Sequence, residues 1–168
     1  SEMCIRDSPY AEEKKIAIPA FNIDTMEITQ AILETVEEEN CPAIIAVGQA
    51  AIKDGKLESL AATVRTLAKD MKAPVVLHLD HGQSVEQVVK ALCAGFTSVM
   101  IDGSKLSFED NIAVTQEVVR IANAAGASVE AELGAILGSE DNISHDDSKP
   151  FLVLSLIHIS EPTRPERI

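Results

Sequence analysis

The chain alternates short apolar runs with longer segments in which apolar residues recur every three or four positions. The apolar runs predict buried strands, and the recurring pattern predicts helices that bury one face. Strands are expected at residues 16–21, 43–47, 75–79, 98–101 and 128–133. Helices are expected between them: the first begins at the capping pair Asp24 and Glu27, and the last two begin at Ser84 and near Ser107 and end at Gly95 and Gly126.

This alternation is typical of a parallel α/β sheet, which is either an open doubly wound sheet or a (β/α)8 barrel. The sequence has no GxGxxG or P-loop motif after a predicted strand, which disfavours a nucleotide-binding open sheet. Each predicted strand instead ends on small or polar residues: Asn22, Gly48 and Gln49, Asp80 and His81, Asp102, and Glu132. In a barrel these ends converge on one mouth. We therefore predict a (β/α)8 TIM barrel truncated to about its first five strands.

Composition narrows the class of protein further. The chain is 46% hydrophobic but only 3% aromatic, so aliphatic side chains must fill the core. Its net charge of −13 argues against nucleic acid as a partner, and it has no apolar run long enough to insert into a membrane. No signal peptide is visible, and three scattered cysteines (Cys4, Cys41 and Cys93) are typical of reduced thiols in a cytoplasmic protein.

Both ends of the chain differ from the interior. Residues 154–164, LSLIHISEPTR, can be read back into codons that resemble a transposase-based sequencing-library adapter, and SEMCIRDS at residues 1–8 fits the reverse complement of that adapter. We therefore expect residues 1–8 and 154–168 to be adapter-derived tails and residues 9–153 to be the folded part. The alternative is a genuine amphipathic strand and tail at the C-terminus.

The side chains at the predicted strand ends suggest metal chemistry. His81, Asp102 and Glu132 offer one imidazole and two carboxylates, a reasonable ligand set for zinc or another divalent ion. Asp80 cannot easily share a strand face with His81, so one of the two could bind a metal while the other transfers a proton. Each group also has a structural alternative, such as a bond to a loop amide, a turn before Gly103 or an ion pair.

Five motifs in order carry a family resemblance: PAFN at residues 19–22, HLDH at 78–81, MIDGS at 100–104, EAELG at 130–134 and SEDN at 139–142. Together they resemble the class II, metal-dependent ketose-bisphosphate aldolases, most nearly the fructose- and tagatose-bisphosphate branch. The resemblance implies a (β/α)8 barrel that reversibly cleaves a ketose 1,6-bisphosphate into dihydroxyacetone phosphate and glyceraldehyde 3-phosphate. It also implies a zinc cofactor that acts as a Lewis acid on the ketone oxygen, in place of a lysine Schiff base.

The resemblance assigns roles to particular residues. His81 corresponds to a ligand of the catalytic zinc, and Asp102 and Glu132 correspond to a second, outer metal position. Asp80 corresponds to the acid that protonates the aldehyde oxygen in the condensation direction. Glu140 corresponds to the carboxylate that exchanges a proton on the dihydroxyacetone phosphate carbon. For Asn22 the implied role is to orient the enediolate.

The resemblance also implies a small-molecule sugar bisphosphate as the partner and, for the full-length parent, a homo-oligomer. Two departures from the family pattern stand out: Gly48 where a hydroxyl residue is usual, and Leu137 where a second glycine is usual. His145 lies in an acidic stretch and is expected to be solvated, and His78 is expected to be structural.

The resemblance implies that two further zinc-binding histidines and the phosphate-binding loops come from strands six to eight. This chain is therefore expected to be an inactive N-terminal fragment. A non-catalytic aldolase-like partner subunit is the alternative. A Schiff-base aldolase is disfavoured because no lysine ends a predicted strand.

Overall fold

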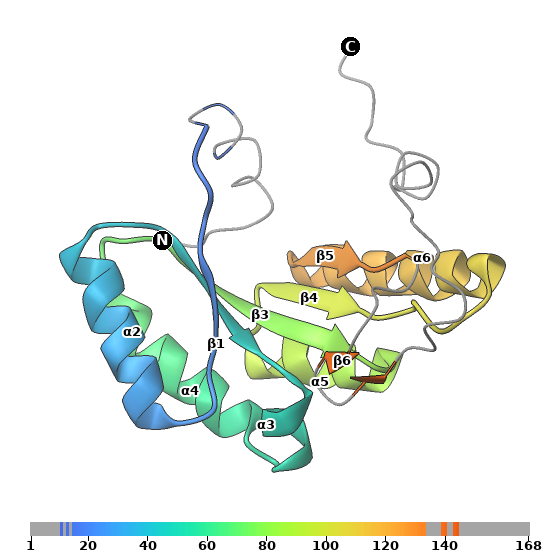
Figure 1. Cartoon of the computed structure of the whole chain (residues 1–168), viewed down its shortest axis with the longest axis horizontal. Helices are drawn as coiled ribbons and strands as arrows, with labels where there is room; N and C mark the ends of the chain where they lie inside the picture. The colour runs from blue at the N-terminus through green and yellow to red at the C-terminus, as the bar shows by residue number, and fades with distance from the viewer. Residues whose placement is uncertain (1–10, 12, 14, 134–138, 141–142, 145–168) are drawn as a thin grey trace.

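The computed structural model describes residues 11, 13, 15–133, 139–140 and 143–144. One parallel sheet contains the strands β1 (Ala20–Asn22), β2 (Ala43–Val47), β3 (Val75–Gly82), β4 (Ser98–Ile101) and β5 (Ser128–Ala131) (Figure 1). The helices are α2 (Met26–Glu38), α3 (Gln49–Lys53), α4 (Leu57–Leu67), α5 (Val85–Ala94) and α6 (Phe108–Ala125), with a 3-10 turn at Ala68–Asp70. A separate antiparallel pair contains β6 (Ser139–Glu140) and β7 (Ile143–Ser144).

The strands lie in the sheet in the order in which they occur in the sequence, from β1 to β5, and every neighbouring pair is parallel. A doubly wound sheet reverses its strand order at a switch point, whereas a (β/α)8 barrel adds each strand beside the previous one. The sequential order therefore confirms the expected barrel-type arrangement over the part of the chain that the structure describes.

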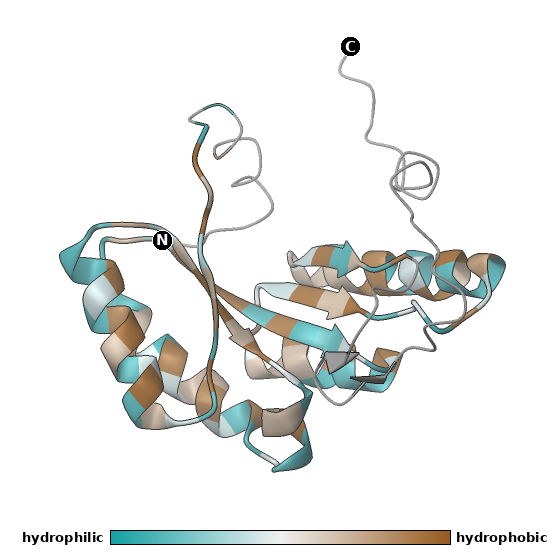
Figure 2. Ribbon diagram, viewed as in Figure 1, coloured by the Kyte–Doolittle hydropathy of each residue, from teal (hydrophilic) through white to brown (hydrophobic). Residues whose placement is uncertain are grey.

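The hydrophobic core lies between the sheet and the helices on one of its faces. Ile45 pairs in register with Leu77, and Leu79 pairs with both Val47 and Val99, so these side chains point to the same face. Figure 2 shows the matching pattern on the helices, where hydrophobic and hydrophilic residues alternate along α2 and α4. The helical members of this core are Leu33, Val36, Ala51, Leu57, Leu60, Ala61, Val64, Val88, Ala91, Val118 and Ala122. Within the described residues, none of the helices has the length and apolar character needed to span a membrane.

The opposite face of the sheet carries a more polar row. Ala46, His78, Ser98 and Ser128 are in register across four strands. The Nδ1 atom of His78 lies 2.8 Å from the Ser98 hydroxyl oxygen, and its Nε2 atom lies 3.5 Å from a carboxylate oxygen of Glu130. His78 is therefore buried with polar partners on both ring nitrogens, as expected for a structural histidine.

Several elements differ from the sequence expectations, and among them β5 ends at Ala131 rather than at residue 133. β1 begins at Ala20 rather than residue 16, because Pro19 has no N–H to donate and contributes only its carbonyl, which accepts from Ile44. β3 continues to Gly82, three residues beyond the expected end at Leu79. The helix α3 was not expected at all.

The helix ends follow local capping rules. The expected caps at Ser84 and Ser107 are confirmed, as are the left-handed glycines Gly95 and Gly126 at the helix ends. The expected start of α2 at Asp24 is wrong by one residue: Thr25 is the N-cap, and its hydroxyl accepts from the Ile28 amide.

Gly82 is expected to be intolerant of any side chain. A Cβ at this position would overlap with the carbonyl oxygen of Met100 and lie 3.0 Å from Cδ2 of Leu79, in the rigid pairing of β3 with β4. Gly82→Ala should therefore lower the free energy of unfolding by about 2–3 kcal/mol, measured by urea denaturation. Gly55→Ala is the control: Gly55 has open space around it and a φ of +71°, so only backbone strain of about 1 kcal/mol is expected. Equal losses in the two variants would contradict the steric explanation.

Candidate metal centre

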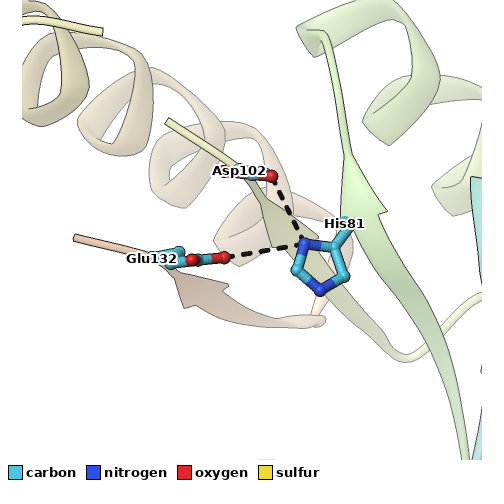
Figure 3. A group of neighbouring side chains, drawn as sticks. All are labelled: His81, Asp102 and Glu132. Atoms are coloured by element: carbon cyan, nitrogen blue, oxygen red, sulfur yellow. Dashed lines mark hydrogen bonds and ion pairs between the residues drawn. The ribbon is translucent and has the colours of Figure 1, made fainter. Parts of the chain in front are cut away.

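Three side chains from consecutive strands meet at one edge of the sheet. His81 lies near the end of β3, while Asp102 and Glu132 directly follow β4 and β5. The Nδ1 atom of His81 lies 3.3 Å from Oδ2 of Asp102 and 3.6 Å from Oε2 of Glu132 (Figure 3). These distances confirm the expectation that the parallel strand ends bring the three side chains together.

A β-bulge turns His81 toward this group. Leu79 pairs with Val99 and Gly82 pairs with Ile101, so Asp80 and His81 together oppose the single residue Met100. His81 has a φ of +48°, in the left-handed region that residues with a Cβ rarely adopt. The bulge breaks the strict alternation of faces, so that two adjacent polar side chains both reach the end of the sheet.

Asp102 is anchored by its own turn. One carboxylate oxygen of Asp102 accepts from the Ser104 amide at 3.0 Å and from the Ser104 hydroxyl at 2.6 Å. Its second oxygen remains for His81. The sequence analysis did not assign a role to Ser104, although an Asp-x-Ser pattern after a strand is a signal for this turn.

Asp80 lies on the other side of the imidazole. Its Oδ1 atom is 4.0 Å from His81 Nε2, and its Oδ2 atom accepts from the Asn22 side-chain amide at 2.9 Å. Figure 3 shows that Nε2 of His81 points away from Asp102 and Glu132. Asp80 and the other two carboxylates therefore face different ring nitrogens, an arrangement that suits separate roles.

The electrostatics of the group depend on this geometry. Burial by itself would lower the pKa of His81, but the hydrogen bond to Asp102 and the charges of Asp80, Asp102 and Glu132 outweigh burial and raise the pKa above its ordinary value. Burial would raise the pKa of Asp102, but the bonds from Ser104 and the contact with His81 lower it below its ordinary value. Asp102 is thus arranged to stay ionised beside one nitrogen of the His81 imidazole.

The donor set suits a divalent cation. One atom each from His81, Asp102 and Glu132 lie within 4.8 Å of one another, and all three side chains are partly buried. Two carboxylates placed this close repel each other unless a cation or a protonated imidazole lies between them. One nitrogen and two oxygen ligands are acceptable to zinc and to other divalent ions of the first transition row.

The other residues singled out in the sequence either lie away from this group or have side chains outside the described residues. Gln49 does not join the group of polar strand ends: it is completely buried, and its side chain bonds to the backbone of β3 and to α5. The backbone of Glu140 forms part of β6, but its side chain lies outside the described residues, as do Leu137 and His145. The role expected for Glu140 stays a prediction.

Comparisons with known proteins agree with this geometry. The profile of the family "fructose-bisphosphate aldolase class-II" matches residues 8–163. The fructose-bisphosphate aldolases of Thermus caldophilus and Helicobacter pylori are 46% identical over 142 residues and 44% identical over 144 residues. These matches cover 84% and 85% of this chain but only 46% and 47% of the relatives. The family match extends past residue 153, and the expected boundary there stays a prediction.

Solved structures of aldolases also resemble this chain. The YdjI aldolase from Escherichia coli K12 superposes with a TM-score of 0.75 at 33% identity, covering 80% of this chain and 51% of that chain. A fructose-bisphosphate aldolase from Campylobacter jejuni gives a TM-score of 0.72 at 26% identity, covering 80% and 47%. The chain therefore spans about half the length of the relatives that it matches.

The sequential parallel strands, with polar groups collected at their carboxyl ends, define the first half of a TIM-barrel fold. The chain belongs to the class-II fructose-bisphosphate aldolase family.

The two described imidazoles are expected to titrate on opposite sides of the ordinary histidine pKa. Burial lowers the pKa of His78, against the opposing effect of Glu130, whereas carboxylates raise that of His81. The stabilising contribution of His81 is present below its unfolded pKa and lost as the pH rises through the raised folded value. The stabilising contribution of His78 is present above its unfolded pKa, and it is lost as the pH falls through the lowered pKa of the folded state.

Ring-proton NMR of the chain in chelator measures both values. Asp102→Asn should lower the midpoint of His81, because Asp102 contacts this ring directly. The midpoint of His78 should not fall with it, because of these two groups His78 senses only the charge of His81, and that charge lowers its pKa. Asp24→Asn, at an exposed position, is the control. A His81 midpoint that does not respond to Asp102→Asn would show that this contact does not form.

Proposed function

We propose that this chain supplies the acid and part of the metal site of a zinc-dependent aldolase. The whole protein would cleave a ketose 1,6-bisphosphate, with fructose or tagatose as the sugar, into dihydroxyacetone phosphate and glyceraldehyde 3-phosphate. The observation that carries this proposal is the meeting of His81, Asp102 and Glu132 within reach of one ion, in a chain of the class-II aldolase family. Relatives named fructose-bisphosphate aldolase support the substrate class.

The roles of the metal-facing residues follow from their chemistry. His81 is assigned as a zinc ligand. Asp102 and Glu132 are assigned as carboxylate ligands of the same ion rather than of a second, outer position, because one atom of each lies within 4.8 Å of the others. Bound zinc would supply a Lewis acid that polarises the ketone oxygen of the substrate. The half-buried setting of the three side chains limits competition from water and strengthens their electrostatic effect.

Asp80 is assigned as the acid that protonates the aldehyde oxygen in condensation and that accepts the same proton in cleavage. The bond from Asn22 supports this role, because it fixes one carboxylate oxygen and leaves the other toward the imidazole of His81. Asn22 also lies at the end of β1, where its amide can orient a substrate oxygen. Glu140 is proposed as the base at the dihydroxyacetone phosphate carbon.

We also propose that this chain alone is inactive. All three residues of β1 are exposed, including Phe21, and Glu130 and Ala131 of β5 are exposed at the other edge. Unpaired strand edges are normally covered in a native protein, and in a barrel further strands pair with them. Homo-oligomeric assembly, implied by the family resemblance, and a cytoplasmic location, indicated by the scattered cysteines, stay predictions.

A chimera tests the proposal in a closed barrel. Residues 9–133 of this chain would replace the matching segment of the Thermus caldophilus relative, and the rate of fructose 1,6-bisphosphate cleavage would be measured with and without chelator. We expect metal-dependent cleavage by the chimera and none by this chain alone. Asp80→Asn should lower kcat by about 10²–10⁴-fold, as removal of a general acid does.

Asp54→Asn is the matched control, because Asp54 is an exposed acid that pairs with Lys56. It should leave the rate unchanged. Cleavage that survives chelation, or an Asp80→Asn chimera as fast as the Asp54→Asn chimera, would contradict the proposed mechanism.

A further inference from the structure

Two buried side-chain amides lie behind the candidate metal centre. Gln49 has no exposed surface and Asn111 is 5% exposed. Gln49 lies at the start of α3 and Asn111 in the first turns of α6. Neither was assigned a functional role by the sequence analysis. A buried amide is costly unless its donors and acceptor are satisfied, so the partners of these two groups are informative.

Gln49 bonds to the backbone of His81. Its side-chain nitrogen donates to the carbonyl oxygen of His81 at 2.8 Å and to Oε1 of Gln87 at 3.1 Å. The Gln87 amide donates back to Oε1 of Gln49 at 3.3 Å, and Oε1 of Gln87 also accepts from the Gln83 amide at 2.9 Å. The two glutamines thus form a reciprocal pair that holds the Gln49 amide in one orientation against β3.

This bond falls where the strand ladder is interrupted. His81 lies in the bulge, outside the paired register of β3 and β4, and has a φ of +48°. A left-handed residue with a Cβ persists only where its surroundings over-determine the backbone. Gln49 supplies such a constraint on one side of the bulge, and the bond from the Asp102 amide to the Gly82 carbonyl, at 2.9 Å, supplies another.

Asn111 makes the equivalent bond to Glu132. Its side-chain nitrogen donates to the Glu132 carbonyl oxygen at 2.8 Å, and its Oδ1 accepts from the Thr115 hydroxyl at 3.2 Å. The Asn111 side chain also lies so close to Gly103 that a Cβ there would overlap with it. Asn111 therefore touches the backbone directly after Asp102 and the backbone of Glu132 at the same time.

We propose that Gln49 and Asn111 are positioning residues that fix the backbone of His81 and Glu132 from behind the sheet, so that the two side chains meet at one ion. This inference rests on the proposed metal-binding function of His81 and Glu132. Neither amide contacts the candidate ligand atoms; each acts through a main-chain carbonyl. Loss of a partner bonded directly to a metal ligand typically weakens metal affinity by about 10–100-fold, and we expect a loss of similar size when the backbone of the ligand is released.

The test replaces each amide by an apolar side chain of similar size, in Gln49→Met and Asn111→Leu. Gln30→Met and Asn123→Leu are matched controls, because both of these residues are exposed on helices. The first readout is made in chelator: a residue with positive φ gives a strong NOE between its own amide and Hα protons. This NOE of His81 should weaken in Gln49→Met and stay strong in both controls.

The second readout is zinc affinity, measured by calorimetry on the full chain. Gln49→Met and Asn111→Leu should each raise the Kd by about 10–100-fold, and the controls should leave it unchanged. In a His81→Ala background, Gln49→Met should cause no further loss, because its effect is transmitted through His81. A purely structural role would lower thermal stability in either background without this coupling.

A second variant tests the role of Gln49 if Gln49→Met does not fold. Gln87 is only half-buried, so Gln87→Met is expected to fold, to release the Gln49 amide in part and to weaken the His81 NOE to a smaller degree. An unchanged His81 NOE in folded Gln49→Met or Gln87→Met would overturn the inference for Gln49. An unchanged Kd in Asn111→Leu would overturn it for Asn111. Absence of zinc binding by the unmodified chain would instead contradict the proposed function, while the NOE would still decide whether Gln49 fixes the backbone.

Discussion

The irregular pairing at the end of β3 is the constraint on which the candidate metal centre depends. In a regular strand, successive side chains point to opposite faces, so Asp80 and His81 would be directed apart and only one would reach the strand-end group. The bulge opposite Met100 and the left-handed backbone of His81 remove this restriction. One short segment can then present a carboxylate and an imidazole side by side, and β4 and β5 add one carboxylate each.

The charges around His81 follow from the same backbone geometry. Asp102 and Glu132 face one ring nitrogen, and Asp80 lies nearest to the other. This separation gives one imidazole two distinct sides, of which one suits a cation and the other suits proton transfer. The bond from Asn22 to Asp80 extends the arrangement to β1, so four of the five strands contribute to it.

Much of the fold could be predicted from the sequence because its signals are local. Apolar runs located the strands, hydroxyl caps at Ser84 and Ser107 and glycines at Gly95 and Gly126 located helix ends, and the polar strand ends identified His81, Asp102 and Glu132 as neighbours. Local patterns also misled in places. Asp24 and Thr25 are both good caps, and which one is used depends on where the chain leaves β1.

The bulge and its supports could not be predicted in the same way. Whether Asp80 and His81 oppose one residue or two depends on the register with β4, which lies about 20 positions further along the chain. Gln49 was expected among the polar strand ends, yet it is buried and bonds to a main-chain carbonyl. A side-chain amide that recognises a backbone group leaves no periodic pattern in the sequence, so only the structure reveals it.

The central claim is that His81 and the carboxylates of the neighbouring strand ends hold one divalent ion. X-ray absorption at the zinc edge, on the zinc-loaded chain, tests this claim most directly. The account predicts a first shell of nitrogen and oxygen at about 2.0–2.2 Å, with an imidazole contribution that disappears in His81→Ala. A sulfur shell at about 2.3 Å, or an imidazole contribution that survives His81→Ala, would contradict it.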